Sequence, residues 1–193
     1  GIAVVISGNS PSHTYADNGV YTVTLSITSP DGRVDVATFQ VTVNNVAPTL
    51  APIPDQTVGQ TRPLDLPNIG QFTDPGFDNP LNSGETSETF TYSINWGDGT
   101  PLNTGVPTID TPGGQGVPTA GSFDGSHIYA DNGVYTVTVT VMDDDGGVTV
   151  QTFEVTVNNV APTLTVAPDT TIGKNSPLTI NDIGQFTDPG FDN

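Results

Sequence analysis

Aspartate is the residue type whose number and spacing most clearly offer chemistry in this sequence. The 193 residues include 21 acids against three Lys and Arg, and only three of the acids are Glu. Calcium is bound in proteins by several oxygen atoms from carboxylates, amides, backbone carbonyls and water. The acids cluster in turn-like segments that could supply such oxygens. We therefore predict a calcium site with the ligands Asp74, Asp78, Asp143, Asp144, Asp145, Asn158, Asn159, Asp188 and Asp192.

The run Asp143–Asp145 indicates where the ion would bind. It precedes the last strand of its unit, and Asn158 and Asn159 follow that strand. In a sandwich such a loop can lie at the pole where the chain leaves, where it would meet Asp188 and Asp192 of the following unit. Three consecutive Asp side chains repel one another unless something neutralises them. A cation there would fix the angle between neighbouring units.

The alternative is that these residues form ordinary Asp-rich turns on a solvated surface. An earlier copy of the loop reads SPDGR at 29–33, where the later copy reads DDDGG at 143–147. The earlier copy lacks two carboxylates and has one more cation, so either that junction is metal-poor or these aspartates are not ligands. The run also does not match an EF-hand, because no Glu closes a twelve-residue loop.

Other side chains with catalytic or binding chemistry have simpler structural interpretations. Trp96 could stack on a sugar, but it is the only Trp in the sequence. It also ends a segment whose apolar residues share one face, so we expect a core aromatic. Ser126, His127 and Asp131 are residue types of a catalytic triad, but no nucleophile elbow accompanies them. We expect His127 to be structural, Tyr129 to form a tyrosine corner, and the chain to have no catalytic residue.

Strands must position these side chains. TFTYSINW at 89–96 alternates so that its apolar residues share one face, and VYTVTVTVM at 134–142 does the same. In the last strand the apolar positions change parity between Val150 and Phe153, which predicts a β-bulge there. Residues 101–121 are rich in Pro, Gly and Thr and predict a long loop or a loose edge ribbon.

A repeat of 114 residues organises the chain. YADNGVYTVT begins at 15 and at 129, VTVNNVAPTL at 41 and at 155, and IGQFTDPGFDN at 69 and at 183. This period matches a whole β-sandwich domain rather than a solenoid turn. We predict the C-terminal part of one repeat at 1–46, a complete repeat at 47–160 and the N-terminal part of the next at 161–193. The chain is then a slice of a longer array, or else a protomer that docks head to tail into a filament.

Composition excludes several functions. A formal net charge of −18 argues against binding to nucleic acid and to anionic membranes, because both attract Lys and Arg. The sequence has no Cys, so the fold needs no disulfide, and no apolar run reaches the length of a membrane span. The many Thr residues make O-linked glycans an additional possibility.

The motifs WGDGTP at 96–101, YADNGVYTVTVTV at 129–141 and DDDGG at 143–147 resemble the PKD (polycystic kidney disease) domain. FTDPGFD and VNNVAP are similar to the junctions of tandem PKD arrays in bacterial and archaeal surface proteins. The resemblance covers essentially the whole chain. It implies an all-β, immunoglobulin-like (PKD-type) sandwich in tandem and a location outside the cell or at its surface, in a prokaryote.

This resemblance implies a structural module rather than an enzyme. We expect a repeat of a surface fibre, filament or adhesin that is rigidified by calcium and whose partners are neighbouring repeats. The alternative is a spacer or binding module of a large secreted enzyme that degrades polysaccharide or protein, since PKD modules also accompany secreted chitinases and collagenases.

Overall fold

Alternating Thr and Val residues form strands along most of the chain, because β-branched residues favour the pleated backbone. The computed structural model describes residues 12–78 and 88–190, and these residues contain no helix. No segment therefore qualifies as a membrane-spanning helix within the described residues. The strands are β1 (Gly19–Thr28), β2 (Val34–Val43), β3 (Thr49–Leu50), β4 (Gln56–Gly59), β5 (Pro63–Leu66), β6 (Phe72–Asp74), β7 (Phe90–Asn95), β8 (Asn103–Gly105), β9 (Thr108–Thr111), β10 (Thr119–Ser122), β11 (Gly125–Ile128), β12 (Gly133–Asp143), β13 (Val148–Asn158), β14 (Thr163–Val166) and β15 (Gly184–Thr187).

Strands β3 to β13 form a central sandwich. One layer is a five-stranded sheet in the order β4-β13-β12-β7-β8, and the other contains the sheet β3-β6-β10-β9 and the pair β11-β5. Strand β4 pairs parallel to β13, while β3 pairs antiparallel to β6 in the opposite layer. The chain changes layers between β3 and β4 because Pro52 and Pro54 cannot donate backbone hydrogen bonds within one continuous strand.

The core lies between these layers and contains the residues that alternation predicts. Val137, Val139 and Val141 of β12 are fully buried, while Thr136, Thr138 and Thr140 point to the outer face. Trp96 is also buried, and its indole N–H donates to Asn103 Oδ1 at 3.1 Å. The core consists of Leu50, Leu64, Ile69, Phe72, Phe90, Ile94, Trp96, Phe123, Tyr129, Val137, Val139, Val141, Phe153, Val155 and Val157.

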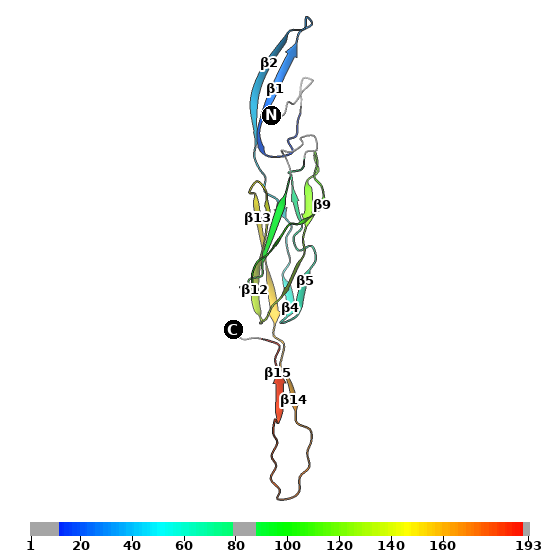
Figure 1. The fold of residues 1–193 in the computed structure, drawn as a ribbon, viewed down its shortest axis with the longest axis vertical. Coiled ribbons are helices and arrows are strands. Elements are labelled where there is room, and N and C mark those ends of the chain that lie inside the picture. Colours follow the sequence, from blue (N-terminus) through cyan, green and yellow to red (C-terminus); the bar gives the residue numbers. More distant parts are fainter. Residues whose placement is uncertain (1–11, 79–87, 191–193) are drawn as a thin grey trace.

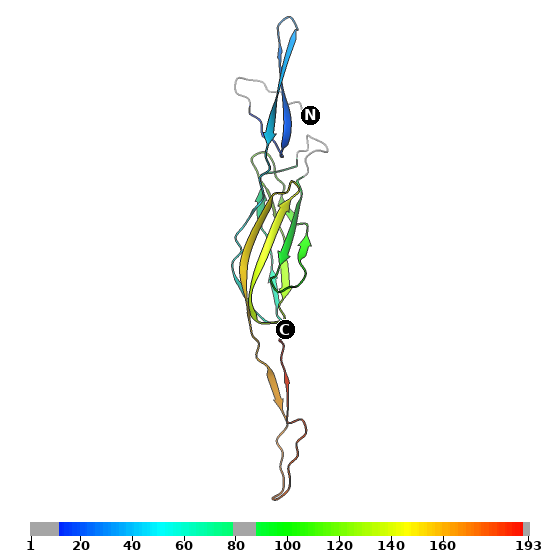
Figure 2. The ribbon, with the colours of Figure 1, turned by 90° about the vertical axis from the view of Figure 1, so that its left-hand side faces the viewer.

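The molecule is a rod, with a two-stranded hairpin at each end of the central sandwich (Figure 1). The N-terminal hairpin is β1–β2, and the C-terminal hairpin is β14–β15. Both hairpins extend along the long axis, as the perpendicular view also shows (Figure 2). Successive units of the 114-residue repeat therefore follow one another in line.

The predicted β-bulge in the last strand is wrong. Strands β12 and β13 pair without a register shift from Gly133↔Val157 to Met142↔Val148, and β1 and β2 do the same. The change in apolar parity has another cause: Val148 and Val150 lie on the outer face and are about half exposed. Single exposed apolar residues are common on protein surfaces, so the pattern needs no irregular backbone.

The tyrosine corner lies at a different residue from the one predicted. Tyr129 is buried and donates its hydroxyl to the carbonyl of Trp96 at 3.0 Å, across the sandwich. The local bond belongs to Tyr135, whose hydroxyl donates to the Asp131 carbonyl four residues earlier at 3.1 Å. Tyr21 makes the equivalent bond to Asp17 in the preceding repeat. The segment 101–121 contains the short strands β8, β9 and the start of β10, which matches an edge ribbon.

Candidate functional site

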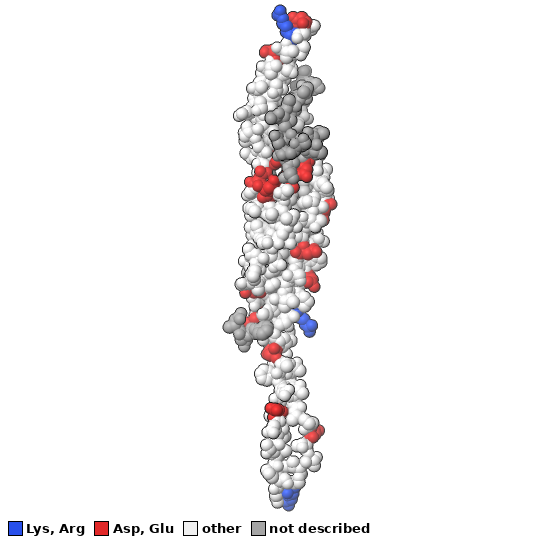
Figure 3. Space-filling view, in the orientation of Figure 1, with Lys and Arg blue, Asp and Glu red and all other residues white. Residues whose placement is uncertain are grey.

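Acidic side chains gather where the N-terminal hairpin meets the central sandwich (Figure 3). The backbone N–H of Phe77 donates to the Ala16 carbonyl at 3.1 Å, and the Asn45 amide donates to Asp143 Oδ2 at 3.0 Å. These contacts join the turn before β1 and the linker after β2 to two loops of the sandwich. The junction acids, as we name this cluster, are Asp17, Asp74, Glu88, Asp143, Asp144 and Asp145.

Asp74 is the most deeply buried of the junction acids. Asp74 is 2% exposed, and its Oδ1 accepts the backbone N–H of Gly76 at 2.7 Å. Its Oδ2 is buried and accepts no hydrogen bond, and Asn18 Oδ1 in the same junction is in the same condition. A buried oxygen without a donor or a cation costs free energy. Two oxygen atoms at this junction thus have unused acceptor capacity.

Burial and like charge raise the pKa values of Glu88, Asp74 and Asp17. Burial raises the pKa of Glu88 to about 8, and the charges of Asp74, Asp144, Asp17 and Asp143 add to the effect. The pKa of Asp74 is raised chiefly by burial and then by the Asp run that it faces. These carboxylates therefore lie close enough to interact, although they come from distant parts of the sequence.

The pKa of Asp17 is also raised, although Asp17 belongs to the preceding repeat. Burial is the main cause, and the carboxylates of Asp145 and Asp144 add to it. The junction acids therefore come from both repeats. A ligand that bound them would join one repeat to the next.

Two glycines allow the chain segments to approach these carboxylates. A Cβ at Gly147 would lie 2.8 Å from the Ala47 Cα atom and 2.9 Å from the Asn45 amide nitrogen. A Cβ at Gly76 would overlap the Glu88 carboxylate. Distances below 3 Å are closer than van der Waals contact permits, so the linker and the DDDGG loop can pack together only with glycine at 147.

The three consecutive aspartates make different contacts. Asp143 is buried, and its Oδ1 accepts the Gly147 N–H at 2.6 Å, which closes the turn. Asp144 Oδ1 accepts the Thr89 N–H at 3.1 Å and holds the start of β7. Asp145 is exposed. One loop thus anchors its neighbours and still presents negative charge to the junction.

No protein cation balances this charge. All three Lys and Arg residues lie in the described part of the chain, and the only ion pairs found there are Arg33–Asp31 and His127–Asp98. Among the described residues, no three acidic or His side chains are already spaced as a complete metal shell. Binding of an ion would therefore require rotation of side chains or the use of amide and carbonyl oxygens.

The predicted ligands do not all lie together. Asp78 lies at the junction and accepts the Glu88 N–H at 2.6 Å. Asp188 lies at the opposite pole of the sandwich, beside Gln60 and Gly190, and so do Asn158 and Asn159. Asp143, Asp144 and Asp145 therefore meet Asp74 of their own unit and Asp17 of the preceding unit, rather than Asp188 of the following one. Asp192 lies outside the described residues.

Sequence reasoning missed Asp17, Asn18, Asn45 and Glu88. The first two belong to the YADNG segment before β1, which marks the repeat and carries no ligand pattern of its own, and Asn45 belongs to the linker after β2. The available signal was the repeat itself, because the turn before β1 and the linker after β2 must lie at the same end of the hairpin. Glu88 has no comparable signal in the sequence.

The residues considered for a catalytic triad make separate contacts. Ser126 donates to Asp65 Oδ1 at 2.6 Å, and His127 Nε2 lies 2.7 Å from Asp98 Oδ2. The His127 ring stacks on Trp96 with the centroids 4.9 Å apart. Burial alone would raise the pKa of Asp98, but hydrogen bonds from Thr100 and His127 hold it below its ordinary value. These contacts fasten the Asp98-Gly99 turn to the core.

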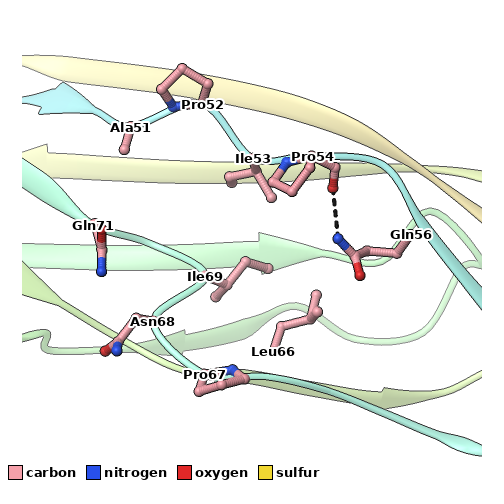
Figure 4. A pocket seen from close by; sticks show the side chains of 10 residues that line it. All are labelled: Ala51, Pro52, Ile53, Pro54, Gln56, Leu66, Pro67, Asn68, Ile69 and Gln71. Atoms are coloured by element: carbon pink, nitrogen blue, oxygen red, sulfur yellow. Dashed lines mark hydrogen bonds between the residues drawn. The ribbon is translucent and has the colours of Figure 1, made fainter.

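The central sandwich also has a shallow apolar groove of about 200 Å³ (Figure 4). It opens between the segments 51–56 and 66–71, where the prolines of the strand switch leave the two layers unpaired. No charged side chain lines it, and Gln56 donates its amide to the Pro54 carbonyl at 2.9 Å. The groove has a structural origin and no convergent polar groups.

The fold and the junction define a tandem immunoglobulin-like sandwich. The profile of the PKD domain matches residues 4–43 and 45–157, and the chain therefore belongs to the PKD domain family. One similar solved structure is the PKD domain of an M14-like peptidase from a Thermoplasmatales archaeon. It is 20% identical, covers 57% of this chain and 92% of its own, and gives a TM-score of 0.32. No curated protein matches.

Proposed function

We propose that this chain is a non-enzymatic structural repeat of an extracellular surface fibre or adhesin, in which calcium at each acidic junction fixes neighbouring repeats in line. PKD domains are structural modules of surface proteins and of enzymes, which supports the general role. The observation that carries the proposal is Asp74, whose buried Oδ2 faces the junction without a donor.

The chemistry of the junction favours a hard cation over a protein donor. Its free groups are carboxylate and amide oxygens, the ligands that Ca²⁺ prefers. Neighbouring carboxylates help to raise the pKa values of Glu88, Asp74 and Asp17, so a divalent ion would relieve several repulsions at once. Calcium fits better than Mg²⁺ because Ca²⁺ accepts irregular shells of six to eight oxygens, whereas Mg²⁺ needs near-ideal octahedral geometry.

The junction acids lie between two repeats, so an ion bound to them would stiffen the connection between those repeats. Asp17 and Asn45 belong to the preceding repeat, and Asp74 and Asp143 belong to the central sandwich. The linker at 44–48 is short and contains Pro48, but within the described residues few hydrogen bonds cross the junction, among them those from Phe77 to Ala16 and from Asn45 to Asp143. An ion that bound both sides would therefore add the strongest link between the repeats. Neighbouring repeats are then the main partners of each domain.

Calcium titration of the melting temperature tests the proposal. A site of extracellular grade, with a Kd of about 10⁻⁴ to 10⁻³ M, should add about 0.6–1.8 kcal/mol in roughly 2 mM Ca²⁺. We expect a saturable rise of a few degrees relative to EGTA and a smaller response to Mg²⁺. Asp74→Asn should remove the response.

Asp169→Asn is the matched control, because Asp169 is an exposed Asp in the C-terminal segment, beyond the opposite pole of the central sandwich. It should leave the calcium response unchanged. Equal responses of the wild-type chain to Ca²⁺ and Mg²⁺, or a response that survives Asp74→Asn, would contradict a specific junction site.

A further inference from the structure

The outer face of the five-stranded sheet has an uncharged area. The ranges 91–95, 102–106, 138–142 and 148–152 lie on or beside β7, β8, β12 and β13, and they contain no Asp, Glu, Lys, Arg or His. We name the outward residues of these four ranges the neutral face. All of them belong to the complete repeat, so the neutral face is a feature of an intact sandwich.

Strand pairing makes the neutral face continuous across four strands. Thr140 of β12 lies opposite Val150 of β13 and Ser93 of β7. Ser93 in turn lies opposite Thr104 of β8. Figure 2 looks onto this side of the sheet, where β12 and β13 lie in front. The outward side chains therefore form one surface on the flank of the rod.

Large apolar side chains of the neutral face are open to solvent. Val106 is 78% exposed, and Val148, Val150 and Met142 are between 43% and 51% exposed. Val106, Met142 and Thr140 line a shallow hollow of about 470 Å³. Apolar side chains that are grouped in one area with a polar rim mark an interaction surface.

The charge of the molecule limits which partner this surface can meet. Acids bound the neutral face at both ends, because Asp144 and Asp145 follow β12 and Glu154 lies further along β13. The opposite layer exposes Asp65 and Asp110. Two chains with a net charge of −18 repel each other, so copies can pack closely only through a surface without acids. A basic partner would be drawn to the acidic surfaces instead.

The exposed valines of the neutral face recur in the preceding repeat. Val34 and Val36 of β2 are the counterparts of Val148 and Val150 at a spacing of 114. Both are more than half exposed, and their counterparts in the complete sandwich are about half exposed. The outer face of the sheet thus has the same character in both repeats. A rod with such a face in each repeat fits a partner of the same period, which is another copy.

The size of the neutral face indicates a weak contact in each repeat. Four strands about 4.8 Å apart and five residues long cover roughly 300 Å². A standard interface buries about 800 Å² on each partner. Faces of several repeats must therefore meet together to hold two rods firmly. Two chains of the present length should associate weakly and reversibly.

From these observations we propose that the neutral face is a lateral contact between two copies of this chain. Their five-stranded sheets pack face to face, at the spacing of about 10 Å that is usual for stacked sheets. The two rods then lie side by side, whereas the acidic junction orders repeats in line. The contact uses none of the junction acids and goes beyond the proposed function.

Sedimentation velocity in EGTA, up to near-millimolar concentration, tests the contact independently of the calcium site. The sedimentation coefficient should rise with concentration. The association constant should be several-fold higher in 1 M than in 0.1 M NaCl, because the Debye length falls from about 10 Å to about 3 Å and repulsion between the acids is screened. A chain that stays monomeric at both salt concentrations would overturn the proposal. Association that disappears in 1 M NaCl would overturn it too, since it would reveal a contact between charged groups.

Val150→Asp and Ile128→Asp form a matched pair of variants. The two residues are 51% and 56% exposed, but Ile128 lies on β11 in the opposite layer. Val150→Asp should weaken the association several-fold, and Ile128→Asp should not. Val150→Lys should weaken it as well, although it lowers the net negative charge, because any charge is costly to bury in an uncharged contact. Equal effects of the two Asp variants would contradict the proposed surface, with melting temperatures confirming that both fold.

Disulfide trapping in the Cys-free chain tests where the copies meet. Thr140 lies near the middle of the neutral face, where a two-fold contact brings a residue close to its own copy. Thr140→Cys should form linked homodimers several-fold faster than Ile128→Cys, although Thr140 is the less exposed of the two in the free chain. An equal or slower rate for Thr140→Cys would refute the face-to-face contact.

Discussion

Without calcium, the junction should become more stable as the pH falls from about 8 to about 5. The change in pH acts through Glu88, whose pKa is raised by burial from the ordinary 4.5 to about 8. The folded chain then binds more protons than the unfolded chain between these two values. The contribution of Glu88 to the free energy of unfolding is therefore fully present below about pH 4.5, and it is lost as the pH rises through about 8.

The magnitude follows from the shift and from the exposure of the side chain. A shift of this size corresponds to about 5 kcal/mol at full burial. Glu88 is only half buried, and screening by water reduces the effect to about 1–2 kcal/mol. For a chain of this length that is a change in melting temperature of about 2–8 °C.

The assay is differential scanning calorimetry in EGTA at several pH values, with hydrogen exchange at residues 16–18 to report on the junction itself. Glu88→Gln should flatten the pH dependence, because the neutral amide titrates in neither state. In saturating Ca²⁺ the slope should weaken or reverse, since protons then compete with the ion. A melting temperature in EGTA that rises with pH across the same window would refute the repulsive carboxylate cluster.

Three further substitutions test other parts of the account. Gly147→Ala should push the Ala47 backbone away and release the Asn45–Asp143 bond, and hydrogen exchange at 44–46 should therefore accelerate. Asp98→Asn should destabilise the central sandwich by about 1–3 kcal/mol in urea unfolding, because it removes the charge that His127 contacts. Tyr135→Phe should cost about 1 kcal/mol in the same experiment through loss of its bond to the Asp131 carbonyl. Unchanged unfolding curves for the last two variants would show that these contacts do not contribute.

The layers of the fold could be predicted because alternation encodes them directly. Val137, Val139 and Val141 share one parity and are all buried, and Trp96 follows the parity of β7 into the core. The same rule led to the wrong bulge, since it assumes that every apolar residue faces inward. Val148 and Val150 face outward, where Val residues are tolerated at little cost.

The candidate site could be predicted in residue type but not in arrangement. Asp74 and Asp143 were identified as candidate ligands because calcium chemistry requires oxygen-rich turns. Their grouping depends on which pole each loop occupies, and this is set by strand direction and by long-range pairing rather than by local sequence. Glu88 joins the cluster only because Asp144 and Asp78 hold the backbone before β7. No short-range pattern could have placed it there.

The distribution of angles between the N-terminal hairpin and the central sandwich is the most direct test of the central claim, which is that a cation fixes the junction. Because the chain has no Cys, spin labels can be attached at Thr28→Cys and Thr104→Cys, both exposed and on opposite sides of the junction. Pulsed electron paramagnetic resonance then gives the distribution of distances between the two spin labels. We expect a narrow distribution in Ca²⁺ and a broad one in EGTA or with Asp74→Asn. Distributions of equal width in Ca²⁺ and EGTA would contradict a junction that calcium stiffens.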